Sequence, residues 1–169
     1  MKEFAYIHDE ENVPDTLLRV PFLETFNKSQ LDDILNSSSI VECEPGDTIV
    51  ADGEEASRIF ILLAGRVNVE KNGKVLVSMD HTGDIFGEFA ALSDERRTAS
   101  VVAETTAVCL AVDQKFLEYA KPKKDNPEFY AALYEFIAKL TAKRLKATSE
   151  ALARMDKELR ELKAAANAD

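Results

Sequence analysis

The chain has no tryptophan, and histidine and cysteine occur only twice each. The two histidines, His8 and His81, are too few for the clustered imidazole ligands of a cupin-type metal site or for a convincing Ser-His-Asp or Cys-His arrangement. A neighbouring pair of carboxylates, Glu54 and Glu55, falls on a turn, where we expect both to be solvated. The sequence therefore favours a ligand-binding module over an enzyme, and we expect no catalytic residue, no metal site and no cofactor.

Long apolar runs are also missing. None reaches the roughly 18 residues of a membrane span, and the N-terminal stretch "MKEFAYIHDEEN" is too acidic for a signal peptide. The cysteines, Cys43 and Cys109, each lie in an apolar, strand-like run. We expect two reduced thiols in the core of a cytoplasmic protein.

Positive charge is the third shortage, with 21 Lys and Arg against 31 Asp and Glu and a net charge of −10. A surface that grips nucleic acid through its phosphates needs the opposite balance. We therefore expect no direct DNA binding by this chain. One small pocket for an anion remains compatible with the charge.

All six glycines lie between Gly46 and Gly87, which separates a turn-rich middle from a glycine-free tail. The middle contains short alternating runs such as "RVNVEKNGKVLVSM", in which Asn72-Gly73 predicts a tight hairpin turn. Before it, "SQLDDILNSS" predicts a short helix with Ser29 as its N-cap. We predict an α+β, mainly β fold: a jelly-roll-like antiparallel β-roll over residues 15–122, with short flanking helices and an N-terminal extension over 1–14.

The tail, residues 126–169, predicts one long helix, because strong helix formers follow Pro122 and Pro127. Its apolar or small residues recur in alternating steps of three and four, over about four heptads. This heptad seam predicts a parallel homodimer through residues 138–166, in which Glu158 would flank Lys163 of the partner helix. The alternative is an amphipathic helix packed on its own roll. The seam residues are Ala138, Thr141, Leu145, Thr148, Leu152, Met155, Leu159, Leu162 and Ala166.

The stretch "FGEFAALSDERRTASV", residues 86–101, has the features of an anion site. Gly87 allows close approach of the backbone, and the free N–H groups of a short helical turn after it attract negative charge. Arg97 adds a permanent charge and a planar fork suited to phosphate. Glu88 would repel an anion but can accept from a sugar hydroxyl, so the pair describes a nucleotide. The alternative is a structural salt bridge between Glu88 and Arg97.

This stretch resembles the phosphate-binding cassette of the cyclic nucleotide-binding domain, and "PGDTIVADGEEASRIFILLAGRVNV" resembles the first half of that domain. The similarity spans roughly residues 18–121. It implies that Glu88 accepts from the ribose 2′-hydroxyl and that Arg97 pairs with the cyclic phosphate, while Arg96 is a solvated neighbour. The resemblance implies a binding set in this region of Phe86, Gly87, Glu88, Phe89, Ala90, Arg97, Thr98 and Ala99.

The tail is similar to the dimerisation helix of the catabolite activator protein family, including its "RL..TSE" core. That likeness implies that Thr148 and Ser149 reach an adenine, partly across the dimer; the alternative is that Thr148 only sets the helix register. We expect a sensor for cAMP, with cGMP as the alternative because Thr98 can bond a guanine. Proteins of the activator family continue into a DNA-reading helix-turn-helix, whereas this sequence ends at Asp169 without one. The sequence therefore does not identify a downstream partner. Two further readings stay open: a sensor domain cut from a channel or transcription regulator, and a dimerisation module with a vestigial pocket.

Overall fold

The computed structural model describes residues 1–169 except 8, 10–13, 89–94, 114–126 and 167–169. Its contacts divide the chain into two compact units, Met1–Phe129 and Tyr130–Asp169, which are described separately. In the part of the chain that the structure describes, no helix is both long enough and apolar enough to cross a membrane.

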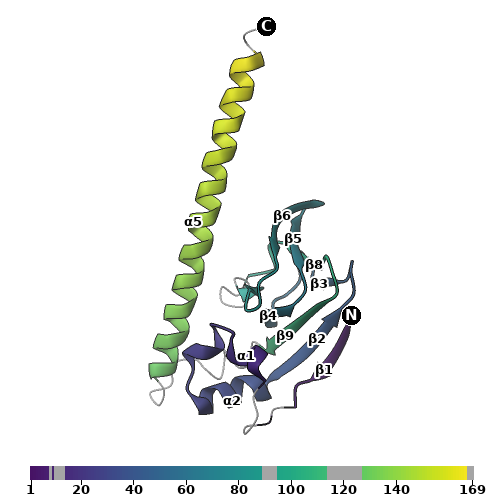
Figure 1. Ribbon diagram of the computed structural model, residues 1–169, viewed down its shortest axis with the longest axis vertical. Coiled ribbons are helices and arrows are strands. Elements are labelled where there is room, and N and C mark those ends of the chain that lie inside the picture. The colour runs from purple at the N-terminus through teal and green to yellow at the C-terminus, as the bar shows by residue number, and fades with distance from the viewer. Residues whose placement is uncertain (8, 10–13, 89–94, 114–126, 167–169) are drawn as a thin grey trace. The chain divides into compact units, whose positions relative to one another are not determined.

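Two antiparallel sheets form the first unit (Figure 1). Together they confirm the predicted antiparallel β-roll. The five-stranded sheet has the spatial order β1 (Lys2–Ala5), β2 (Ser38–Cys43), β9 (Ala107–Asp113), β4 (Arg58–Ala64) and β7 (Ile85–Phe86). The four-stranded sheet has the order β3 (Thr48–Val50), β8 (Ser100–Ala103), β5 (Val67–Lys71) and β6 (Lys74–Met79).

The hairpin between β5 and β6 turns at Asn72-Gly73, as the sequence predicted. Lys71 and Lys74 are paired across it, and Asn72 and Gly73 have φ angles of 52° and 71°. Two consecutive positive φ angles are typical of the tight turn whose twist matches that of its strands.

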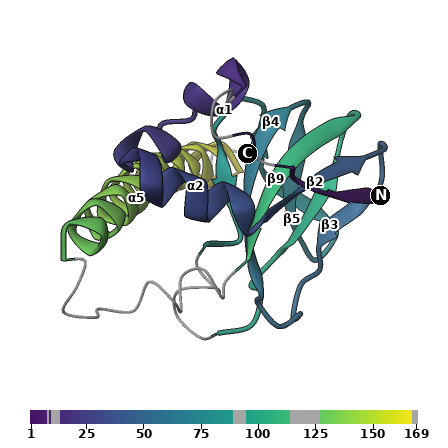
Figure 2. The ribbon, with the colours of Figure 1, turned by 90° about the horizontal axis from the view of Figure 1, so that it is seen from below.

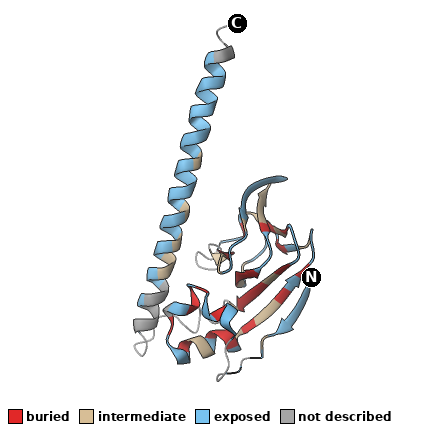
Figure 3. Ribbon diagram, in the orientation of Figure 1, coloured by how far each residue is buried: buried red, intermediate tan, exposed pale blue. Residues whose placement is uncertain are grey.

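The core lies between the inner faces of the two sheets, and alternate residues of β4 and β9 belong to it. Buried residues are red in Figure 3. Phe60 of β4 and Phe86 of β7 stack there with ring centroids 5.3 Å apart. Both cysteines belong to this cluster as free, buried thiols, which confirms the expectation of core cysteines. Burial raises the pKa of the Cys109 thiol to about 12, and the neighbouring Cys43 acts in the same direction.

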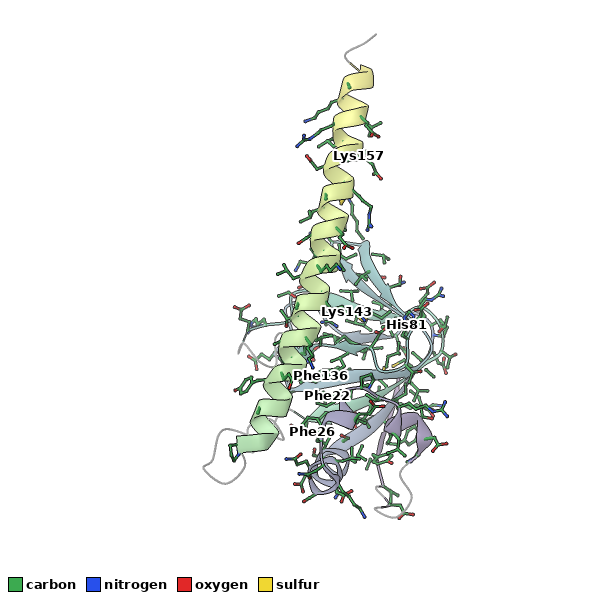
Figure 4. The ribbon with its side chains drawn as sticks, turned by 60° about the vertical axis from the view of Figure 1, so that its left-hand side comes forward. Phe22, Phe26, His81, Phe136, Lys143 and Lys157 are labelled. Carbon is green, nitrogen blue, oxygen red and sulfur yellow. The ribbon has the colours of Figure 1, made fainter. Side chains whose placement is uncertain are left out.

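The short helices α1 (Asp15–Leu18), η1 (Leu23–Thr25) and α2 (Lys28–Asn36) lie beside the five-stranded sheet (Figure 2). Ile61 and Leu110, which alternate along their strands with the residues of the inner core, are also buried. So are the helix residues Leu17, Leu23, Ile34 and Leu35. The central strands β4 and β9 of this sheet are therefore buried on both faces. Phe22 and Phe26, labelled in Figure 4, pack edge to face with centroids 5.1 Å apart.

The N-cap of α2 is Asn27, so the prediction of Ser29 was wrong. The Asn27 side chain accepts from the Gln30 N–H at 3.1 Å, and the Gln30 side chain accepts from the Asn27 N–H at 3.0 Å. This capping box satisfies two backbone donors at once, which Ser29, inside the first turn, cannot do. The strand β1 was not predicted from the sequence. It lies within the expected N-terminal extension and pairs with β2.

The second unit is one helix, α5 (Pro127–Ala166). Lys143 and Lys157 are among the described side chains that project from this helix (Figure 4). The large apolar residues of the heptad seam are between 50% and 69% exposed, namely Leu145, Leu152, Met155, Leu159 and Leu162. The helix thus carries an exposed apolar strip with coiled-coil spacing.

Candidate functional site

Arg97 is the only charged side chain that is buried among the described residues, with 6% of its surface exposed. Its Nη1 donates to the Gly87 carbonyl, and its Nη2 donates to the Arg58 carbonyl at 2.7 Å. Burial lowers the pKa of Arg97, while the charges of Glu54 and Glu88 act in the opposite direction. Because an arginine keeps its proton in proteins, the site presents a fixed, partly desolvated cation.

Gly87 lies next to the guanidinium, directly after β7. Its φ is +78°, in the left-handed region, and a Cβ at this position would lie 2.7 Å from Nη1 of Arg97. Both facts require glycine, because any other side chain would be strained and would press on the arginine. The geometry therefore gives a reason for the glycine before Glu88 that differs from the close approach to a ligand expected from the sequence.

Glu88 follows Gly87 as a half-buried residue. Its carboxylate is close enough to act on the pKa of Arg97, so the two residues share one site. A guanidinium and a carboxylate held on the same short stretch can bind two parts of one ligand, an anionic group and a hydroxyl.

The backbone of Arg97 is fixed from the other side by the loop between β3 and β4, residues 51–57. The Arg97 N–H donates to the Glu54 carbonyl at 2.9 Å, and the Gly53 N–H donates to the Arg97 carbonyl at 2.8 Å. The contacts of Arg97 with this loop and with the carbonyl of Arg58 were not predicted from the sequence. Backbone acceptors leave no mark in a sequence, because every residue type supplies the same carbonyl.

The neighbours of Arg97 differ from it in burial. Arg96 is exposed, donates to the Gly53 carbonyl at 3.0 Å and forms a surface ion pair with Glu55 at 3.5 Å. Thr98 is exposed and Ala99 is half-buried. Of the two adjacent arginines, Arg97 is the one whose guanidinium bonds to the Gly87 carbonyl.

The remaining predicted residues are Phe86, Phe89, Ala90, Thr148 and Ser149. Phe86 is 2% exposed and its side chain belongs to the core. Only the backbone of Phe86 can therefore contribute to the site. Phe89 and Ala90 lie outside the described residues. Thr148 and Ser149 are exposed on α5, in the second unit, and their proximity to a ligand stays a prediction.

Comparison with known proteins extends this geometry. The profile of the cyclic nucleotide-binding domain family matches residues 40–120. cGMP-dependent protein kinase 2 of Mus musculus is 32% identical over 121 residues, covering 68% of this chain and 16% of the kinase. The cAMP-dependent protein kinase type II regulatory subunit of Drosophila melanogaster is 30% identical over 105 residues, covering 62% of this chain and 26% of the subunit. The chain thus spans only a small part of these relatives.

A solved structure supports the fold. A protein from Geobacter metallireducens GS-15, named for cyclic nucleotide binding, is similar with a TM-score of 0.68 and 22% identity, over 78% of this chain and 97% of that one. The matched segment holds Gly87, Glu88 and Arg97 in the arrangement described above. Residues 40–120 of this chain are therefore similar to the cyclic nucleotide-binding domain family.

Proposed function

We propose that this chain is a regulatory sensor that binds a cyclic nucleotide without chemical change and passes the binding event to α5. The observation that carries the proposal is the buried Arg97 guanidinium beside Gly87 and Glu88, within the segment that matches the family. In this proposal the cyclic phosphate is the anion that Arg97 neutralises, and Glu88 accepts from the ribose 2′-hydroxyl. The backbone of Gly87, Phe89 and Ala90 and the N–H of Ala99 complete the cradle.

We infer cAMP as the ligand, with cGMP as the alternative. Thr98 is exposed next to Arg97, where its hydroxyl can serve either the phosphate or a guanine amino group. Thr148 and Ser149 favour adenine, because their oxygens can accept from its N6 amino group, which guanine lacks at that edge. The named relatives include both a cGMP-dependent and a cAMP-dependent kinase protein, so they support the ligand class and not the base.

The coupling that we propose runs through a parallel homodimer of α5. The large seam residues of this helix are exposed, and burying one such side chain contributes about 1.5–3 kcal/mol. A polar Thr148 within the seam lowers dimer stability unless it has a second task, and reading the base would be that task. Ligand binding would then stabilise one arrangement of the two helices over another.

We also place the protein in a reducing compartment, the cytoplasm. The support is the pair of free, buried thiols, Cys43 and Cys109, on the neighbouring strands β2 and β9. Oxidising compartments favour disulfides in small domains, whereas these two cysteines are used as apolar core residues.

Calorimetric titration with cAMP and cGMP tests the proposal directly. Replacing Arg97 with Ala should weaken binding by about 1.5–3 kcal/mol, the range for a hydrogen bond to a charged group. Arg97→Lys keeps the charge but loses the fork, and should recover only part of the affinity. Arg96→Ala is the matched control, because Arg96 also donates to a carbonyl but is exposed. Equal losses at both arginines, or no binding by the parent chain, would contradict the proposal.

A further inference from the structure

We propose that Asp52 is a positioning residue for the anion site: together with Lys71 and Ser100 it holds the loop between β3 and β4 against the backbone of Arg97. The inference rests on the proposed function for its effect on ligand affinity. Its effect on the loop itself needs no ligand and can be measured separately.

The first step is the dependence of Arg97 on this loop. Residues 95–99 have no helix or strand of their own, so their backbone path is set by bonds to other segments. Both main-chain groups of Arg97 bond to the loop, through Gly53 and Glu54. A shift of the loop would therefore shift the point from which the arginine side chain extends.

The second step is what holds the loop. The Asp52 N–H donates to the Ser100 hydroxyl at 3.0 Å, which ties the loop to the first residue of β8. Both carboxylate oxygens of Asp52 accept from Nζ of Lys71, each at 2.7 Å. Lys71 is the last residue of β5, so Asp52 connects the loop to two strands of the four-stranded sheet.

The third step explains why this ion pair has a task beyond stability. An isolated exposed pair contributes little to folding, and Asp52 and Lys71 are both more than a third exposed. Here, however, the pair adds a side-chain tie to a loop of seven residues whose other bonds run mainly to Arg96 and Arg97. Gly53 in that loop has φ +79°, and a Cβ there would meet nothing within 4 Å. The loop end next to Asp52 is also the end that bonds to Arg97, so a local restraint acts directly on the site.

The experiment uses the full chain with Asp52→Asn and Lys71→Gln. Amide hydrogen exchange without ligand should rise about two- to fivefold at Gly53 and Arg97 in either variant, the fold-change expected for an exposed ion pair. Titration with cAMP should show a similar two- to fivefold loss of affinity. The charge reversal Asp52→Lys with Lys71→Asp should restore both quantities, and 1 M salt should remove the difference between parent and Asp52→Asn.

Asp80→Asn is the matched control, because Asp80 is an exposed carboxylate paired with Arg66 at 3.3 Å and its loss changes the net charge by the same amount. It should leave exchange at Gly53 and Arg97 unchanged. Unchanged exchange in Asp52→Asn would overturn the inference even if the parent binds cAMP. Raised exchange in Asp52→Asn, combined with a parent chain that binds no cyclic nucleotide, would support the positioning role and refute the proposed function.

Discussion

Replacing Gly87 with Ala should separate the stability of the domain from its affinity. The added Cβ would lie 2.7 Å from Nη1 of Arg97, a distance at which one of the two groups must move. The arginine tip is the flexible partner, so the guanidinium should yield while the backbone stays. Its bond to the Gly87 carbonyl and its aim at the ligand would then be lost.

Two energies follow from this geometry. An alanine at positive φ costs about 1–2 kcal/mol of folding stability, because its Cβ crowds the carbonyl. The lost charge-assisted bond should weaken cAMP binding by about 1.5–3 kcal/mol, which is roughly a 10- to 150-fold rise in Kd. Urea denaturation measures the first quantity and calorimetric titration the second.

The control is Gly73→Ala, in the hairpin between β5 and β6. Gly73 has φ +71°, close to the +78° of Gly87, but a Cβ there meets nothing within 4 Å. It should lose the same stability and keep its affinity. The reasoning fails if Gly87→Ala binds cAMP within twofold of the parent, or if Gly73→Ala loses affinity as well.

Three further predictions concern the tail and the core. Leu152→Glu combined with Leu159→Glu puts charges into the heptad seam and should give monomers in sedimentation; an unaltered oligomer would mean that the seam is not the interface. Thr148→Ala with Ser149→Ala should weaken cAMP binding by about 1–3 kcal/mol and leave cGMP binding nearly unchanged, and equal affinity to the parent would remove the case for adenine. Because the pKa of Cys109 is raised from 9.0 to about 12 in the folded state, the unfolded chain loses this proton first as the pH rises. Unfolding free energy should therefore fall between pH 9 and 12, and Cys109→Ala should fall less steeply.

The β-roll could be predicted because its signals are side-chain patterns. Alternation in β5 and β6 and the Asn72-Gly73 turn between them specify a hairpin from local sequence alone. The strand β1 could not be predicted in the same way. It is an edge strand whose four residues are all exposed, so no alternation of apolar and polar residues marks it.

The N-cap of α2 shows a signal that was present but misjudged. Asn27 and Ser29 are both good cap formers, and neither is decisive by itself. Gln30, three residues after Asn27, completes a capping box and could have decided the choice. Spacing to a second residue carried the information, and the type of the cap residue did not.

The candidate site also contains groups that a sequence pattern can reveal and groups that it cannot. That Glu88 and Arg97 act together could be predicted, because a carboxylate and a guanidinium are each tied to a residue type. Their binding roles, and that of Gly87, stay predictions. The groups that hold Arg97 in place are carbonyls of Arg58, Gly87 and Glu54, and they were not predictable. A carbonyl becomes an acceptor for a buried cation only once the fold has brought it there. Substitutions that displace the guanidinium or loosen the loop behind it, such as Gly87→Ala or Asp52→Asn, therefore test this site more sharply than removal of the side chains at positions 54 or 58.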